Sequence, residues 1–476
     1  MSGVLATRSR AFLALLALLW LAGTLRAFVL WSHEPLHAYA NSYDQTRYTN
    51  CFGFHPDRPA EVPPQQNSPE APYSRFRFIA SGDPMCYWSS ELVFTGATAL
   101  AWRIGETLGF AGPHDVRLVG ALRWSVLLAL SLAFSLAWWR RGEPRAAFAN
   151  ALLVPLLFAD PANTLYLDTF YAEWTALLAA YALVAAILLW RDAPFGRLRF
   201  ALLALAAFAL ATAKIQHLLL PLAIALVVVM LDRWRLGRIG WRSLALVFGA
   251  GAGFWLQFGQ LQRDNPMMDA IDQYNRADVV FTALLPASDD PRGLLVELGI
   301  DPDCAQYSGL HAWEMPGMPE QVCAGFSGFG RGDQLAALLH HPRLAATLAA
   351  HSVLALDPWL AREIGHVEGG TFTIGPPARA SIDRLLHGST LLRLVLLGAP
   401  LAAALVLLWR PGPRRGSRAL EHAVLTALVM VATLAVTVLG DGLADVAKQG
   451  HLVTNAALAW WMVGVVAIAA AARRRV

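Results

Sequence analysis

The stretch EWTALLAAYALVAAILLWRDAPFGRLRFALLALAAFALATAKIQHLLLPLAIALVVVMLDRWRL, residues 173–236, decides the fold. It contains three apolar runs, which lie at about 173–190, 198–213 and 217–232. Three arginines, Arg191, Arg197 and Arg199, lie between the first run and the start of the second, whereas the segment between the second and third runs carries none. Apolar runs approaching about 20 residues are typical of transmembrane helices, and arginines gather in cytoplasmic loops. The stretch therefore predicts three consecutive spans of alternating direction.

The whole chain has the same character. Of its 476 residues, 56% are hydrophobic and 15% are charged, whereas a soluble domain has about 25% charged residues. This composition excludes an ordinary cytosolic enzyme, a disordered protein and a nucleic-acid-binding protein. We expect an all-α polytopic membrane protein, with about ten transmembrane helices at 11–31, 119–139, 146–160, 173–190, 198–213, 217–232, 243–259, 389–409, 420–439 and 453–472. The third run is short and contains Pro155.

Arginines in the short loops set the orientation. With ten spans, six arginine groups fall on one side: Arg8 and Arg10; Arg140, Arg141 and Arg145; Arg191, Arg197 and Arg199; Arg233, Arg235, Arg238 and Arg242; Arg410, Arg414, Arg415 and Arg418; and Arg473, Arg474 and Arg475. The opposite short loops, near 161–172, 214–216 and 440–452, carry no arginine. We therefore expect a multi-pass protein of the bacterial inner (plasma) membrane with both termini in the cytoplasm. We also expect the first span to be retained, because Arg26 and Trp31 stand where a small-residue cleavage site is required.

Two long segments then face the periplasm. The predicted organisation is a first span at 1–31, a first periplasmic segment at 32–118, spans two to seven at 119–259, a second periplasmic segment at 260–388, and spans eight to ten at 389–476. The run at 91–110 carries three charges, and an additional span there would reverse the arginine pattern. It is therefore interpreted as an amphipathic helix on the membrane surface.

The four cysteines fit this topology. Cys51 and Cys86 lie in the first periplasmic segment, and Cys304 and Cys323 lie in the second. Two pairs in exported segments indicate two disulfides in an oxidising compartment, although four cysteines allow three pairings. No metal-ligand spacing is present, and no cofactor is expected.

Two polar clusters lie close to the predicted outer ends of spans. The first, NSYDQTRY at 41–48, contains Asp44 and Arg47. Asp44 is suited to act as a general base, although such residues are also common in solvated turns. The second cluster, at 160–174, contains Tyr171 and Glu173. Glu173 opens a span, where an anion also stabilises the helix N-terminus, and the tyrosines also suit an interfacial aromatic belt.

The only two lysines of the chain, among 36 arginines, also fall at predicted outer ends. Lys214 precedes His217, and Lys448 lies between Asp441, Asp445 and His451. Positive charge there opposes the usual topology rule, and binding of a lipid-linked phosphate explains it. The alternatives are snorkelling of the side chain and, for Lys448, a local helix pair with Asp445 three residues earlier.

Carboxylates and cations on the outer face suggest that a sugar is transferred from a polyprenyl phosphate to an acceptor. A carboxylate removes the proton of the acceptor hydroxyl, and cations stabilise the departing phosphate. Nucleotide sugars are cytoplasmic donors, and the sequence has neither an Asp-x-Asp motif nor a Walker motif. We therefore expect as partners the lipid bilayer, a polyprenyl-phosphate sugar donor, and a glycan or lipid-linked acceptor, with no nucleic acid.

These residues resemble those of the GT-C superfamily of integral-membrane glycosyltransferases, in particular bacterial surface-glycan (S-layer or exopolysaccharide) hexosyltransferases of the WsfD type. The resemblance is carried by NSYDQTRY (41–48), NTLYLDTFYAEW (163–174), YNRADVVFTALLPASDDPRGLLVELGIDP (274–302) and GDGLADVAKQGHLVTN (440–455). It implies inverting hexose transfer with Asp44 as the catalytic base. It also implies a site lined by Glu173, Lys214, His217, Asp441, Asp445 and Lys448. Similar proteins have Lys-His in the last motif, whereas Gln449 and Gly450 separate Lys448 from His451 here.

Two alternatives remain open. A glycan polymerase or ligase would rely on outer-segment arginines, for which Arg263 and Arg276 are candidates. A transporter of lipid-linked glycans would carry charges near the bilayer midplane and, often, repeated halves. The transferase hypothesis requires Asp44, Glu173 and the two lysines to converge on one pocket at the periplasmic face.

Overall fold

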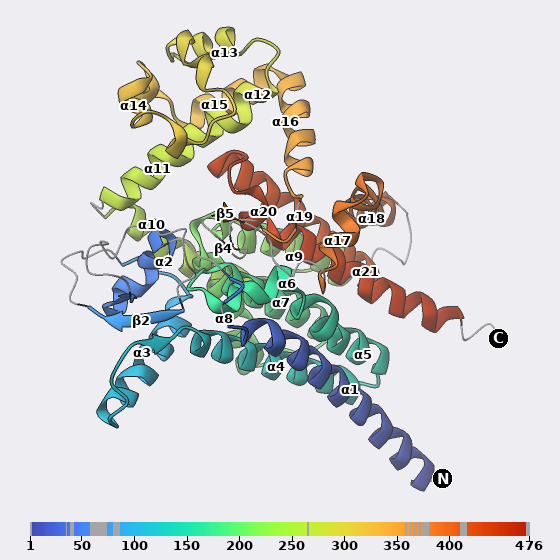
Figure 1. The fold of residues 1–476 in the computed structure, drawn as a ribbon. Helices are drawn as coiled ribbons and strands as arrows, with labels where there is room; N and C mark the ends of the chain where they lie inside the picture. Colours follow the sequence, from blue (N-terminus) through green and yellow to red (C-terminus); the bar gives the residue numbers. More distant parts are fainter. Residues whose placement is uncertain are drawn as a thin grey trace. The chain divides into compact units, whose positions relative to one another are not determined.

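The computed structural model describes residues 2–34, 36–38, 42–57, 74–79, 86–263, 266–357, 359–361, 364, 367–368, 371–372, 380–409 and 417–472 (Figure 1). The chain forms two compact units. Unit 1 comprises Met1–Gln260, Leu360–Val429 and Asn455–Val476, and unit 2 comprises Leu261–Trp359 and Met430–Thr454. Asn41 and the orienting arginines at 410, 414, 415 and 473–475 lie outside the described residues.

Helices occupy all ten ranges in which spans were predicted. They are α1 (Ser2–Trp31), α4 (Arg117–Arg140), α5 (Pro144–Leu153), α7 (Glu173–Leu189), α8 (Arg197–Ala213), α9 (Leu220–Leu236), α10 (Trp241–Leu261), α18 (Thr390–Trp409), α19 (Arg418–Asp441) and α21 (His451–Ala472). In the described part of the chain, seven helical stretches are long and apolar enough to cross a membrane: Arg10–Trp31, Arg117–Arg140, Ile215–Leu236, Trp241–Leu261, Thr390–Trp409, Arg418–Asp441 and His451–Ala470. The protein is thus an all-α polytopic membrane protein, as predicted.

The predicted third span is bent rather than straight. Helix α5 continues as a π-helical turn at Val154–Phe158, and the chain then turns by 75° into Pro161–Asp168. Pro155 lacks the amide hydrogen that a regular helix needs at this point, which favours the irregular turn. The second limb consists of α6 (Pro161–Thr164) and a 3-10 turn at Leu165–Asp168. The limb leads directly to the start of α7.

The segment at 32–118, which the sequence predicts to face the periplasm and which we call the first outer segment, is a small mixed structure. It contains α2 (Ser42–Thr49), a 3-10 turn at Asn50–Phe52, α3 (Leu92–Thr107), and the strands β1 (Phe54–Pro56), β2 (Arg75–Phe78) and β3 (His114–Asp115). The strands form an antiparallel sheet in the order β1-β2-β3, which the sequence analysis did not predict. Phe54, Phe76, Trp102 and Phe170 pack in its core. This core attaches the segment to the loop before α7.

Helix α3 corresponds to the helix predicted at the membrane surface. Its inner face buries Thr95, Ala99 and Trp102. Its other face exposes large apolar side chains, including Val93 and Leu100. This distribution matches the pattern expected of an interfacial amphipathic helix.

Unit 1 also contains the strands β4 (Val367–Glu368) and β5 (Thr371–Phe372) and the helix α17 (Asp383–His387). Unit 2 begins with α11 (Pro266–Asp278) and a π-helical turn at Val279–Leu284. Short helices and 3-10 turns follow: α12 (Leu285–Ala287), α13 (Pro291–Glu297), Pro302–Tyr307, Ala312–Glu314, α14 (Pro319–Val322), Phe326–Gly328, α15 (Arg331–His340) and α16 (Pro342–Leu354). The later part of unit 2 contributes α20 (Val446–Gln449).

Each of the two segments predicted to face the periplasm has its own disulfide. Cys51 is joined to Cys86 in unit 1, and Cys304 is joined to Cys323 in unit 2. Among the three pairings that the sequence allowed, the structure contains the one in which each bond stays within its segment.

Candidate functional site

Helix α2 carries the first predicted polar cluster. The Asp44 carboxylate Oδ1 lies 2.7 Å from Nη2 of Arg47, one helical turn later. The Asp44 side chain is 21% exposed, so it keeps contact with solvent. The side chain of Gln45 accepts a hydrogen bond of 3.0 Å from the amide of Phe170. This bond fixes α2 against the loop that precedes α7.

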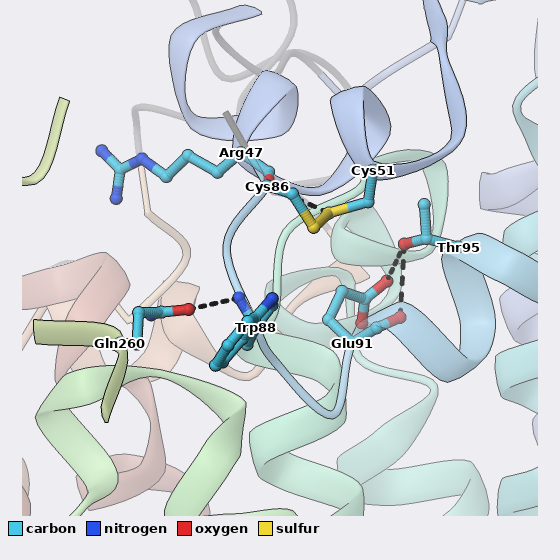
Figure 2. The surroundings of a disulfide bond; sticks show 7 residues. All are labelled: Arg47, Cys51, Cys86, Trp88, Glu91, Thr95 and Gln260. Atoms are coloured by element: carbon cyan, nitrogen blue, oxygen red, sulfur yellow. Dashed lines mark hydrogen bonds between the residues drawn. A yellow bond between two sulfur atoms is a disulfide. The ribbon is translucent and has the colours of Figure 1, made fainter. Parts of the chain in front are cut away.

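The segment after the disulfide holds α2 from its other end (Figure 2). The amide of Tyr87 donates to the carbonyl oxygen of Arg47 at 2.8 Å. The amide of Trp88 donates to Gln260 of α10 at 2.5 Å. Ser89 donates through its hydroxyl to the carbonyl of Ala213 at 2.7 Å, which places this segment at the end of α8. Residues 87–89 therefore connect α2 with the ends of α8 and α10.

Glu173 and Lys214 form an ion pair in unit 1. Glu173 is the first residue of α7, as predicted, and Lys214 follows the last residue of α8 in an extended conformation. The Lys214 Nζ lies 2.5 Å from Oε1 of Glu173. The Glu173 side chain is 3% exposed and that of Lys214 is 15% exposed. A carboxylate at a helix N-terminus is stabilised by the helix dipole, and a nearly buried one requires a partner of this kind.

Tyr48 follows Arg47 on α2 and is buried. Its ring packs edge-on against that of Tyr87, with a centroid distance of 6.0 Å. Burial raises the pKa of Tyr48 well above its usual range, and the charges of Tyr87 and Glu173 act in the same direction. Tyr48 therefore remains a neutral phenol. We call Asp44, Arg47, Tyr48, Glu173 and Lys214 the unit 1 cluster.

Two other predicted residues adjoin this cluster in sequence. Tyr171 is buried in the loop before α7, with its ring 6.5 Å from that of Tyr166. His217 is buried in a 3-10 turn at Ile215–His217, three residues after Lys214. The amide of His217 donates to the carbonyl of Lys214 at 2.9 Å, so the turn also fixes the lysine backbone.

An ion pair that the sequence analysis missed lies behind the cluster. Arg123 of α4 and Glu91, which precedes α3, are both fully buried, and Nη2 of Arg123 lies 2.6 Å from Oε1 of Glu91. The two residues are 32 positions apart. An arginine within an otherwise apolar span was the available signal, because intramembrane charges are rare and usually functional.

The remaining predicted site residues lie in unit 2. Lys448 of α20 pairs with Asp445, with a distance of 2.5 Å between Nζ and Oδ2, which is the local pair considered as an alternative role for this lysine. Asp441 accepts a hydrogen bond from Gln449. His451 is buried at the start of α21.

Asp278, at the end of α11, belongs to the same region. Its Oδ1 accepts a hydrogen bond of 2.8 Å from the amide of Ala312. Burial, followed by the charge of Asp441, raises its pKa to about 8. Gly442 has a φ of +64°, and a Cβ there would collide with the carbonyl oxygen of Asp278, so only glycine fits this turn. We call Asp278, Asp441, Asp445 and Lys448 the unit 2 cluster.

The predicted residues thus form two clusters, one within each unit, and their convergence on one pocket stays a prediction. In the described part of the chain, no group of three or more His, Cys, Asp or Glu side chains is arranged to hold a metal ion. Arg276, one of the arginines on which the polymerase alternative relied, is paired with Asp272 at 2.9 Å and with Glu320 at 3.3 Å.

Comparison with known proteins gives one match. Residues 108–333 match a family model described as the YfdI N-terminal transmembrane domain. This range is just under half of the chain. It includes Glu173, Lys214 and Asp278, whereas Asp44 and Lys448 lie outside it. Neither the curated proteins nor the solved structures compared with the chain give a match.

Proposed function

We propose that the protein is a GT-C-type membrane glycosyltransferase. It transfers a hexose from a polyprenyl-phosphate donor to a glycan or lipid-linked acceptor. The reaction takes place at the periplasmic face of the bacterial inner membrane, with both chain termini in the cytoplasm. The match to the YfdI transmembrane domain, which belongs to a GT-C-like glycosyltransferase family, supports this class. The observation that carries the proposal is the unit 1 cluster, which combines the partly exposed Asp44 carboxylate and its Arg47 partner on the polar helix α2 with the Lys214 ammonium at the end of the apolar helix α8.

Asp44 is the proposed general base. Its carboxylate accepts the proton of the acceptor hydroxyl while the hydroxyl oxygen attacks C1 of the hexose. The bond from C1 to the phosphate oxygen breaks, and its electron pair leaves with the polyprenyl phosphate, so the configuration at C1 is inverted. A positioned base of this kind contributes roughly 10²–10⁴-fold to the rate. The ion pair with Arg47, at 2.7 Å, fixes the direction of the carboxylate.

Lys214 is the proposed phosphate ligand. An ammonium group has three N–H donors, and the bond to Glu173 uses one of them. Glu173 therefore fixes the direction of the ammonium, and the other donors can bind phosphate oxygens as negative charge develops there. Tyr171 and His217 are proposed to line this part of the site. In unit 2, Asp441, Asp445, Lys448 and His451 are proposed to bind substrate as a separate cluster.

The test is transfer by purified protein in lipid nanodiscs. The donors are radiolabelled hexoses on polyprenyl phosphate, with the same hexoses on nucleoside diphosphates as the comparison. We expect label in the acceptor, with release of polyprenyl phosphate, only from the lipid-linked donors. Transfer only from nucleotide sugars would contradict the proposed donor. Movement of intact donor across proteoliposome membranes without bond cleavage would instead establish a transporter.

A further inference from the structure

Arg123 is held in an unusual environment for an arginine. It is the seventh residue of the 24-residue helix α4, has no exposed surface, and uses its guanidinium for four hydrogen bonds. Nη1 donates to the carbonyl oxygens of Tyr166 at 2.8 Å and Thr169 at 2.6 Å. Nη2 donates to Glu91 at 2.6 Å and to the carbonyl oxygen of Tyr171 at 2.8 Å. Three of the four acceptors thus belong to one short segment, residues 166–171.

This segment needs such a partner. It begins in a 3-10 turn and becomes extended at Thr169, so its carbonyl groups are not satisfied by a regular helix. Unsatisfied carbonyls are costly within an apolar helical assembly, and a buried guanidinium can satisfy several of them at once. Removal of the guanidinium therefore takes one hydrogen bond from each of these three carbonyl groups and loosens the segment.

The same segment positions both sides of the unit 1 cluster. The amide of Phe170 donates to Gln45, the neighbour of Asp44 on α2. Tyr171, whose carbonyl binds Arg123, lies two residues before Glu173. A shift of residues 166–171 therefore moves both carboxylates of the cluster.

Glu91 fixes the other side of Glu173. Its Oε2 accepts a hydrogen bond of 2.5 Å from the hydroxyl of Thr175, which lies two residues after Glu173 on α7. Its Oε1 accepts a bond of 3.2 Å from Thr95 of α3 (Figure 2). Glu173 thus lies between one residue held by Arg123 and another held by Glu91.

We infer that the Arg123–Glu91 ion pair is a positioning device that sets the geometry of Asp44 and Glu173 for glycosyl transfer. The inference rests on the proposed function. Both side chains are fully buried, so they act through the segment at 166–171 and through Thr175 rather than by contact with substrate. A misplacement of reacting groups by about 1 Å can reduce a rate by about 10²-fold.

The experiment compares Arg123→Lys, which keeps the charge but loses the planar fork of donors, with Arg103→Lys. Arg103 of α3 forms an ion pair with Glu106 at 3.0 Å, and its side chain is mostly exposed, so this variant is the matched control. For Arg123→Lys we expect kcat to fall by about 10²-fold while KM for the lipid-linked donor changes less than about threefold. We also expect faster amide hydrogen exchange at residues 165–172. Arg103→Lys should match the wild type in all three measurements.

Thr175→Val provides a second variant that leaves the ion pair intact. It removes one hydrogen bond to Glu91, and we expect a smaller loss of kcat, with KM again unchanged. If Arg123→Lys keeps wild-type kcat and exchange, or if KM rises while kcat is retained, the positioning role is wrong. If Arg123→Lys does not fold, Thr175→Val decides whether the positioning role is correct. Wild-type kcat and exchange in this variant, or a raised KM with kcat retained, would then show that the role is wrong. A wild-type protein that transfers no hexose from lipid-linked donors contradicts the proposed function instead, while hydrogen exchange still tests whether Arg123 holds the segment.

Discussion

Arg242→Met tests the account of how the spans of unit 1 are held together. Arg242 of α10 is 2% exposed, and its guanidinium lies 2.5 Å from Asp232 of α9 and 2.7 Å from Glu421 of α19. It also donates to the carbonyl of Ile187 in α7 at 2.8 Å. One side chain therefore connects four helices. Its removal leaves two buried carboxylates without their shared cation.

The expected magnitude follows from the partners that remain. Breaking a buried ion pair by removing one member costs about 3–5 kcal/mol. Arg235 stays 3.1 Å from Asp232, and Arg191 stays 3.0 Å from Glu421, so each carboxylate keeps a second cation. We therefore expect the low end, about 3 kcal/mol, which corresponds to a fall in Tm on the order of 5 °C.

The assay is thermal unfolding in detergent micelles, followed by tryptophan fluorescence. The control is Arg77→Met, because Arg77 pairs with Asp57 at 2.6 Å but is half exposed, and exposed pairs contribute at most about 1 kcal/mol. Equal shifts of Tm for the two variants would refute the reasoning, since burial of the ion pair would then make no difference to its contribution.

Three further predictions follow from the same principles. The pKa of Asp278 is raised to about 8, so the native state keeps a proton that the unfolded state releases near pH 3.8. The free energy of unfolding should therefore fall as pH rises from about 4 to 8, by at most about 1.4 kcal/mol per pH unit. Asp278→Asn should flatten this pH dependence, measured by hydrogen exchange at several pH values. An unchanged slope would contradict the raised pKa of Asp278. The Cys51–Cys86 bond closes a loop with a sequence separation of 35. The double variant Cys51→Ser/Cys86→Ser should therefore have a free energy of unfolding lower by about 3–4 kcal/mol in denaturant unfolding, and a reduced transfer activity. Unchanged stability would show that the bond does not secure α2. In a double-mutant cycle, Glu173→Gln and Lys214→Met should show a coupling energy of about 1–3 kcal/mol, and additive effects would mean that the ion pair is not formed.

The sequence was sufficient to predict where the apolar helices lie, because their physical signals are local. Apolar runs and loop arginines can be counted along the chain, and helices occupy all ten predicted ranges. In the described residues, however, seven of these ranges contain a helix long and apolar enough to cross a membrane, or eight if the bent third helix is counted, because α7 and α8 are shorter. The helix at 91–110 was recognised from its charges, and Pro155 marked the irregular third span, although the 75° bend that follows could not be derived from the sequence. The small sheet was missed because its strands are two to four residues long and pair across large gaps.

The candidate site was predictable only in part, because its partners are distant in sequence. Glu173 and Lys214 were both selected, but their pairing across 41 positions requires the packing of α7 against α8. Arg123 and Glu91 were missed for the same reason, since neither forms a motif by itself. The local pair of Lys448 with Asp445, three residues apart, was foreseen.

The most direct test of the central claim compares Asp44→Asn with Asp57→Asn in hexose transfer from a polyprenyl-phosphate donor. The two carboxylates are matched, because each lies in the first outer segment, is partly exposed and pairs with one arginine, at 2.7 Å and 2.6 Å respectively. We predict that Asp44→Asn lowers the initial transfer rate by roughly 10²–10⁴-fold, whereas Asp57→Asn retains the wild-type rate. Equal rates for the two variants, with equal amounts of folded protein, would contradict the assignment of Asp44 as the base.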